Sequence, residues 1–223
     1  MRGRLLKRSF FEDAPERVAP RLLGKLLVHK TAAGLVAGRI VEVEAYLGPD
    51  HATPDPAAHS HRGPTPRNRV LFGPAGFAYV YSIYGLYNCM NFSCEKEGLG
   101  GGVLLRALEP VAGMAQMARN RNLGPGAEAC ELTGGPSRLC QALGLTRPTH
   151  NGLDLLDPRS PLQVRDDGMR VTRVLVTRRI GIRHAVELPL RFAVPDHPCV
   201  SGPKRMTGRL VILRSGRVFK LKR

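Results

Sequence analysis

Residues 77–94 form the stretch that most limits how this chain can fold. Their sequence, FAYVYSIYGLYNCMNFSC, is rich in aromatic and β-branched residues and is interrupted once, by Gly85. Residues of these types favour strands, and a glycine between two strand-like runs favours a tight turn. We therefore predict a β-hairpin that turns at Gly85, with Tyr84 beside the turn.

Further strands and helices alternate along the chain without the regular rhythm of βαβ units. The segments KLLVHK and GRIVEVEAYLG flank residues 31–34 and predict a second hairpin. More strands are expected at residues 103–110, 171–177 and 189–194, and a last basic hairpin at 209–223, turning at Ser215 and Gly216. Interspersed strands and helices of this kind predict an α+β fold.

Prolines and glycines set the expected helix ends. A short helix or two at residues 9–24 is expected to be interrupted at Pro20, because proline lacks the amide hydrogen that a helix interior uses. Pro110 and Pro136 are each expected to open a helix, and Gly144 is placed to end the second one. Residues 48–76, rich in proline and glycine, are expected to form a long loop, and such loops are often functional.

The chain is strongly basic. Its 34 lysines and arginines, against 18 acidic residues, give the 223 residues a net charge of +16. This charge predicts a polyanionic partner, most commonly nucleic acid, although a GC-rich genome also enriches arginine. With 43% hydrophobic residues, the chain is too apolar to be a disordered basic tail.

Several classes of protein are excluded by what the sequence does not contain. No stretch approaches the roughly 18 apolar residues that a membrane span needs, and the first residues turn polar too early for a secretory signal. The five cysteines form no CxxC pair, which predicts free thiols in a reducing compartment. We expect no metal site and no cofactor.

The segment at residues 40–46 brings two carboxylates together. Strand alternation is expected to place Ile40, Glu42, Glu44 and Tyr46 on one face, and Val41, Val43 and Ala45 on the other. Two explanations remain open at this point. Either the face is solvated and its carboxylates pair with some of the many arginines, or the carboxylates carry chemistry.

Tyrosine is concentrated in one place. Four of the five tyrosines fall within residues 79–87. Tyr84, at the expected hairpin tip, is exposed unless something covers it, and in a basic protein that could be a stack of nucleic-acid bases. Ordinary sheet packing is the expected role of Tyr79 and Tyr87.

Five motifs resemble, in order, those of the alkyladenine (3-methyladenine or methylpurine) DNA glycosylase family. They are GRIVEVEAYLGP, AAHSHRGPTPRN, AYVYSIYGLYNCMN, VLLRALEP and GGPSRLCQALG. The resemblance extends over residues 16–201, and the length and unusual composition of the motifs argue against chance agreement. It implies a single compact domain with a curved, mostly antiparallel sheet, a protruding β-hairpin and flanking helices.

The resemblance also implies an activity. Such an enzyme flips an alkylated or deaminated purine out of duplex DNA and hydrolyses its N-glycosidic bond, leaving an abasic site. Glu44 matches the general base that activates the water. Arg106 matches the arginine that helps to hold this water, and the carbonyl of Ile180 aligns with its third contact.

Other matched positions concern the base itself. Tyr46, His59 and Tyr81 match the aromatic pocket that sandwiches the extruded base, and Asn91 matches the side chain that crowds the exocyclic amine of guanine. Tyr84 matches the residue that wedges into the duplex. The partner implied is double-stranded DNA that contains damaged bases. The enzyme is expected to be a monomer without an obligate protein partner. Its expected location is the cytoplasm, of the bacterial type, where it associates with the nucleoid through DNA.

Three features depart from the family pattern or leave a choice open. A short insertion at residues 50–54 blurs the match before His59, for which His61 is the competing candidate. The chain is expected to divide into a glycosylase domain, residues 1–203, and a basic C-terminal hairpin extension, residues 204–223. Arg121, Arg138, Lys204 and the basic residues of that hairpin are candidates for phosphate contacts. The alternative for the hairpin is a solvated edge of the sheet that its charges protect from further pairing.

The alternative function is a non-catalytic basic DNA-binding module that recognises distorted duplexes. An RNA-binding protein is a third possibility.

Overall fold

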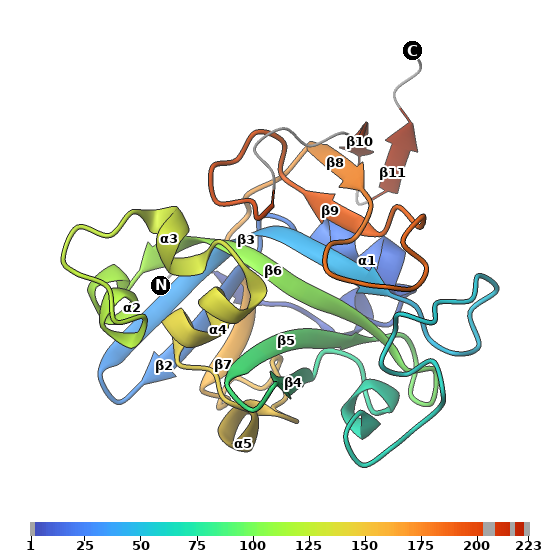
Figure 1. The fold of residues 1–223 in the computed structure, drawn as a ribbon, viewed down its shortest axis with the longest axis horizontal. Coiled ribbons are helices and arrows are strands. Elements are labelled where there is room, and N and C mark those ends of the chain that lie inside the picture. Colours follow the sequence, from blue (N-terminus) through green and yellow to red (C-terminus); the bar gives the residue numbers. More distant parts are fainter. Residues whose placement is uncertain (1–2, 203–207, 215–216, 221–223) are drawn as a thin grey trace.

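The computed structural model describes residues 3–202, 208–214 and 217–220 (Figure 1). The strands are β1 (Arg4–Leu5), β2 (Leu26–Thr31), β3 (Gly34–Tyr46), β4 (Ala78–Ile83), β5 (Tyr87–Cys94), β6 (Gly101–Ala112), β7 (Leu162–Asp166), β8 (Arg173–Thr177), β9 (Arg191–Ala193), β10 (Arg209–Arg214) and β11 (Arg217–Lys220). The helices are α1 (Pro15–Leu22), α2 (Met114–Asn120), α3 (Ala129–Thr133), α4 (Pro136–Leu143) and α5 (Arg147–His150), with 3-10 turns η1 (Arg8–Phe10) and η2 (Arg69–Phe72).

The long strand β3 is the centre of a single antiparallel sheet. It pairs with β2 along Gly34–Arg39, with β9 along Glu42–Glu44, and with β6 from Ala37 to Tyr46. Because three strands share β3, the sheet curls into a half-barrel (Figure 1). Helix α1 packs on β3, while α3 and α4 pack on β6 and β5. The predicted α+β fold, a single compact unit with a curved antiparallel sheet, is confirmed.

A β-bulge in β3 decides which of its side chains face the same way. The pairing with β6 shifts register between Ile40 and Glu42, and again between Glu42 and Val43. Ile40 therefore packs in the main core with Val43, whereas Val41 packs in a separate small cluster. The prediction that Ile40 shares a face with Glu42 is wrong, since an extra residue in one strand reverses the alternation. The two carboxylates of this strand do lie together.

The hairpin of β4 and β5 has the predicted position and turn. Ile83 pairs with Tyr87, and the amide of Leu86 donates to the carbonyl of Ile83 at 3.1 Å. Tyr84 and Gly85 have φ angles of 53° and 72°, both in the left-handed region, as in a type I′ turn. A bulky residue seldom adopts such an angle, so the turn holds the Tyr84 ring out in solvent at a cost in backbone energy.

Two predictions about prolines are wrong. Pro20 lies inside α1, close to its C-terminal end, where the loss of one amide donor leaves the short helix intact. Pro110 does not open a helix but lies within β6, opposite Gly38 at a shift in the strand register. Bulges of this kind are where a sheet tolerates proline. The helix begins only at Met114, after Gly113 turns the chain with a φ of 77°.

Helix α4 follows the sequence signals closely. Pro136 occupies its first turn, and Gly144 ends it in the left-handed conformation with a φ of 69°. The long loop expected at residues 48–76 is also present, with the single 3-10 turn η2 within it.

The C-terminal strands extend the edge of the sheet. Strand β10 pairs with β8, and β11 pairs with β10, both antiparallel. The predicted turn at Ser215 and Gly216, and the candidate phosphate ligand Lys204, lie outside the described residues. The division into residues 1–203 and 204–223 stays a prediction.

In the described part of the chain, no helix has the length and apolar character needed to cross a membrane.

Candidate active site

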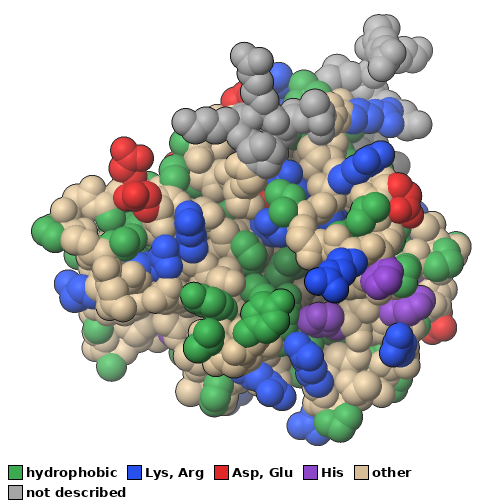
Figure 2. All heavy atoms as spheres, in the orientation of Figure 1, with side chains coloured by type: hydrophobic (Ala, Val, Ile, Leu, Met, Phe, Trp, Pro, Cys, Tyr) green, Lys and Arg blue, Asp and Glu red, His purple; other side chains and the backbone are tan. Residues whose placement is uncertain are grey.

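A cavity of about 360 Å³ lies where strands β3 to β6 meet two loops, residues 48–68 and 178–185. This volume falls within the range of small-molecule sites. Figure 2 shows this face hollowed at its centre, with hydrophobic side chains inside and Lys, Arg and His side chains around them. Among the residues that line the cavity are Tyr46, His59, Tyr79, Tyr81, Cys89, Asn91, Arg106 and Ile180.

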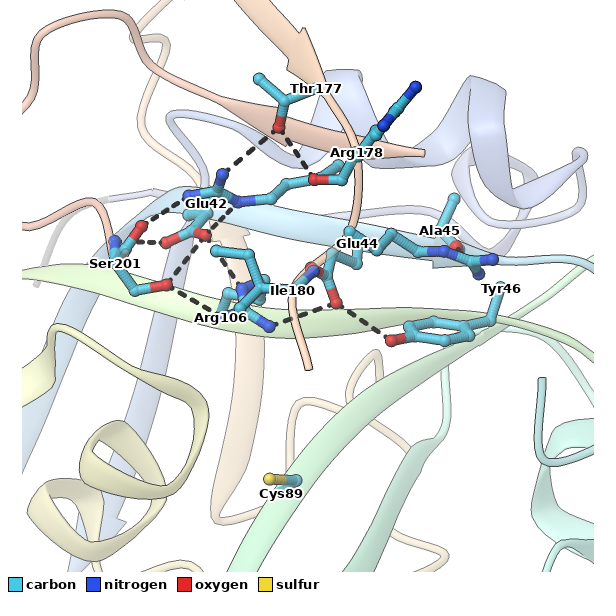
Figure 3. A network of polar contacts seen from close by, with 12 residues as sticks. Glu42, Glu44, Ala45, Tyr46, Cys89, Arg106, Thr177, Arg178, Ile180 and Ser201 are labelled. Atoms are coloured by element: carbon cyan, nitrogen blue, oxygen red, sulfur yellow. Dashed lines mark hydrogen bonds and ion pairs between the residues drawn. The ribbon is translucent and has the colours of Figure 1, made fainter. Parts of the chain in front are cut away.

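Glu44 lies behind the wall of this cavity and has no exposed surface (Figure 3). Its Oε1 accepts a hydrogen bond from the Ile180 amide at 2.8 Å. Its Oε2 accepts from the Tyr46 hydroxyl at 3.0 Å and lies 3.2 Å from Nη1 of Arg106. Burial, and then the charge of Glu44, raise the pKa of Tyr46, so its hydroxyl remains a donor. The three groups that hold Glu44 all line the cavity.

Glu42 anchors the arginine that reaches Glu44 (Figure 3). It has no exposed surface, and its Oε1 accepts from Nε of Arg106 at 2.9 Å and from Nε of Arg191 at 2.6 Å. The amide and hydroxyl of Ser201 also donate to it, at 2.6 and 2.9 Å. Burial opposes the charge of Arg106, but Glu44 and Glu42 outweigh it and raise the pKa of the guanidinium. The carboxylates thus pair with arginines, as one explanation held, but their face is buried and not solvated.

A second buried ion pair stands next to the first. Both carboxylate oxygens of Asp55 accept from Arg179, each at 2.7 Å, and neither side chain is exposed. The Arg179 guanidinium also donates to the carbonyl of Ala45 at 3.1 Å and lies 4.6 Å from the centroid of the Tyr46 ring. Asp55 accepts from the amide of Leu47 at 3.0 Å. The pair therefore joins the end of β3 to both loops that line the cavity.

Three aromatic rings form another part of the cavity wall. Nδ1 of His59 lies 3.0 Å from the Tyr79 hydroxyl, and its ring meets that of Tyr81 edge to face at 4.5 Å. Tyr79 and Tyr81 stack at 5.4 Å. Partial burial, and then Arg67, lower the pKa of His59, so the imidazole is neutral near pH 7. His61, the competing candidate, does not line the cavity.

Three tyrosines of the β4–β5 hairpin, Tyr79, Tyr84 and Tyr87, differ in how far they are buried. Tyr79 is 1% exposed, so its predicted packing role is confirmed, although its hydroxyl also contacts His59. Tyr87 is 52% exposed, so the prediction that it packs in the sheet is wrong. Tyr84 is 92% exposed and follows Ile83, which lines the cavity. The hairpin tip thus stands beside the cavity mouth.

Asn91 and Cys89 lie on the β5 side of the cavity. Asn91 is buried, and its Nδ2 has no hydrogen-bond partner among the described residues. A buried amide without a partner is costly, which favours a role toward a ligand. Cys89 lies 3.7 Å from the Ser137 hydroxyl, and burial raises the pKa of its thiol, so it is not a ready nucleophile.

The structure thus brings the predicted site residues together. Those that line the cavity are Tyr46, His59, Tyr81, Asn91, Arg106 and Ile180. Glu44 stands one layer behind, and Tyr84 beside the mouth. Ile180 contacts Glu44 through its amide N–H, whereas the role predicted for its carbonyl stays a prediction.

Two buried residues of the site were missed by sequence reasoning. Asp55 belongs to the DPAAHS segment and Arg179 directly precedes Ile180, but no spacing rule pairs positions so far apart in the chain.

Two of the candidate phosphate ligands precede the C-terminal hairpin and lie among the described residues. Arg121 donates to Gln141 at 2.7 Å, and Arg138 is exposed. Within the described ranges, no three or more His, Cys, Asp and Glu side chains gather as a metal site would require.

Comparison with known proteins agrees with this geometry. A model of the family described as methylpurine-DNA glycosylase matches residues 9–198. The chain belongs to the methylpurine-DNA glycosylase family. This confirms the resemblance seen in the sequence, and with it the expected class of enzyme, a DNA glycosylase, which hydrolyses N-glycosyl bonds.

Relatives from three organisms are similar over most of their length. A protein of Koribacter versatilis is 49% identical over 199 residues, which is 89% of this chain and 94% of the relative. One from Bradyrhizobium diazoefficiens is 46% identical over 201 residues, 90% and 92% of the two chains. One from Methanoculleus marisnigri is 49% identical over 200 residues, 88% and 98%. The names of all three contain the words 3-methyladenine DNA glycosylase.

Proposed function

We propose that this protein excises methylated and other damaged purines, 3-methyladenine among them, from double-stranded DNA by hydrolysis, with Glu44 as the general base. The observation that carries the proposal is the position of Glu44, a buried carboxylate held by three groups that all line one cavity. A base inside a duplex cannot reach such a cavity, so the nucleotide must first be flipped out at a cost of a few kcal/mol.

Tyr84 is suited to the flipping step. Its exposed ring stands at the tip of the hairpin next to the cavity, where it can enter the duplex and replace the stacking lost by the extruded base. Two exposed arginines at the cavity are suited to phosphates: Arg183 lines it, and the Arg67 guanidinium lies 5.8 Å from the centroid of the Tyr81 ring. Such contacts hold the duplex independently of its sequence.

The cavity is suited to the extruded purine. Tyr46 and the stacked pair of Tyr79 and Tyr81 offer aromatic surfaces, which attract a cationic alkylated base. His59 is neutral and so does not repel that cation. The unpartnered amide of Asn91 is a donor, and it disfavours the exocyclic amine of an undamaged guanine, which is also a donor.

The chemical step needs a nucleophile more than an acid. Glu44 accepts a proton from a water as the water oxygen bonds to C1′ of the sugar, and the C1′–N bond breaks. The bonding electrons leave with the base, and a cationic base departs as a neutral molecule. Arg106, held charged by Glu42, helps to orient the water. The products are a free base and an abasic site, with no lysine adduct and no strand cleavage.

The substitution Glu44→Gln tests the proposal. It removes the base but keeps the size of the side chain, so excision of a methylated purine in single-turnover assays should fall by about 100-fold or more. Binding to a duplex with an uncleavable abasic analogue should be retained. Glu109→Gln is a matched control, because this carboxylate on β6 is 45% exposed and lies 3.8 Å from its arginine.

Two outcomes contradict the proposal. Full turnover by the Glu44 variant would remove its role as the base. A wild-type protein that binds the lesion duplex but releases no base would instead match the non-catalytic module. That the enzyme acts as a monomer in the cytoplasm is part of the same proposal, and sedimentation of the purified chain tests the monomer.

A further inference from the structure

We infer that Asp55 and Arg179 are a positioning and specificity-determining pair, which keeps the cavity wall receptive to cationic bases. The inference rests on the proposed function, since it concerns which bases that cavity accepts. The pair is fully buried and bidentate, and it does not itself line the cavity. Its effect on the substrate must therefore pass through the groups it holds.

Position is the first effect. Arg179 donates to the carbonyl of Ala45, beside Tyr46, and is itself the neighbour of Ile180, whose amide holds Glu44. Asp55 accepts from the amides of Leu47 and Ala57, which fixes the start of the loop that carries His59. One ion pair thus joins three separate segments of the wall. Residues that hold reacting groups in place act on the rate through geometry.

Charge is the second effect. The Arg179 guanidinium lies 4.6 Å from the centroid of the Tyr46 ring. Tyr46 lines the cavity and Arg179 does not, so the cation stands behind the ring, on the side away from the cavity. A base stacked on the near side of Tyr46 would be separated from that cation by little more than the ring. Without compensation, the cation would repel a positively charged base across the ring.

Asp55 supplies that compensation. Both of its oxygens lie 2.7 Å from Arg179, so the pair is neutral as a unit toward the cavity. Removal of the carboxylate alone should therefore penalise cationic bases more than neutral ones of similar size. A merely structural pair would instead affect both kinds of base equally, and this difference makes the inference testable.

The experiment compares single-turnover excision of a cationic base, 7-methylguanine, with that of a neutral one, hypoxanthine, in otherwise identical duplexes. In Asp55→Asn, the ratio of the two rates should fall by about tenfold relative to the wild type. The double variant Asp55→Asn with Arg179→Met should restore the ratio, whatever its absolute rates. Arg179→Met alone should not lower it. Thermal unfolding of each variant identifies losses that come from folding.

Asp167→Asn serves as the matched control. Asp167 pairs in the same bidentate manner with Arg39, at 3.2 and 2.8 Å, and Arg39 also donates to a backbone carbonyl. Neither residue lines the cavity. This variant should leave the ratio unchanged.

The inference is overturned if the ratio stays constant in all variants, or if the double variant keeps the defect of Asp55→Asn. If Asp55→Asn does not fold, Arg179→Met alone tests the inference. This variant removes the cation, so a fall in its ratio of 7-methylguanine to hypoxanthine excision would overturn the inference. These outcomes differ from failure of the proposed function, in which the wild type and Asp167→Asn release neither base.

Discussion

The buried network around Glu42 gives the sharpest prediction about stability. Glu42 has no exposed surface and faces two arginine nitrogens, at 2.6 and 2.9 Å, as well as the amide of Ser201 at 2.6 Å. The substitution Glu42→Gln keeps one carbonyl oxygen for the arginines but turns the other acceptor into an amide. That amide then faces the N–H of Ser201, so that two donors meet. The charge that compensates Arg106 and Arg191 is lost as well.

The size of the effect follows from these contacts. Removal of one partner from a buried ion pair lowers the free energy of unfolding by about 3–5 kcal/mol. In a protein of this length, each kcal/mol corresponds to about 2–4 °C, so the melting temperature should fall by roughly 10 °C. Urea unfolding followed by circular dichroism measures the first quantity, and a thermal scan measures the second.

Comparison with two other variants separates stability from catalysis. Glu44→Gln should be less destabilising than Glu42→Gln, because Glu44 makes one arginine contact and Glu42 makes two, yet its excision defect should be larger. Glu109→Gln, at a half-exposed carboxylate, should stay within about 0.5 kcal/mol of the wild type. If the free energy of unfolding of Glu42→Gln lies within 1 kcal/mol of the wild-type value, the reasoning is refuted, because the charge of Glu42 would then contribute little to stability.

Two further predictions concern the hairpin and a histidine pair. Tyr84→Ser should weaken binding to a paired lesion by about tenfold, because stacking of one base on an aromatic ring contributes about 1–3 kcal/mol. Tyr84→Phe should bind as the wild type does. Equal binding of the wild type and both variants to lesion and abasic duplexes would exclude the wedge. His29 and His150 are buried with their Nε2 atoms 3.2 Å apart, and burial lowers the pKa of both below 6.5. The unfolded chain therefore binds protons that the native state does not, so the free energy of unfolding should fall as pH drops below about 6.5. Urea titrations at pH 7.5 and 5.5 measure this decrease in the free energy of unfolding, which should be smaller in His150→Gln than in the wild type. An equal decrease in both proteins would assign the pH dependence to other groups.

The parts of the fold that depend on local signals could be predicted from the sequence. The β4–β5 hairpin and helix α4 are examples, because Gly85, Pro136 and Gly144 act on their nearest neighbours. Pro20 and Pro110 were misplaced because their tolerance depends on context: the end of a short helix in one case, and a strand opposite Gly38 in the other. Such context is set by tertiary pairing, which a single sequence does not report.

The candidate site, like the fold, could be predicted only in part. The resemblance named residues that line the cavity, but the strand pattern alone could not show whether the Glu42 face is wet or buried. The bulge after Ile40 also reversed the expected faces, and no residue type in that segment marks it. Asp55 and Arg179 lie 124 positions apart, so only the folded chain brings them into contact.

The charge of the chain and the charge of the site act at different places. In and behind the cavity wall, three buried carboxylates face three buried arginines, so these charges balance. The carboxylates are Glu42, Glu44 and Asp55, and the arginines are Arg106, Arg179 and Arg191. The net charge of +16 therefore comes from residues elsewhere in the chain, and exposed arginines at the cavity mouth are among them. A basic surface attracts the phosphates of any DNA, damaged or not. Under the proposed function, a cationic base that leaves the duplex would meet a wall whose buried arginines are each compensated, so selection among bases would occur inside the cavity without opposing the attraction outside it.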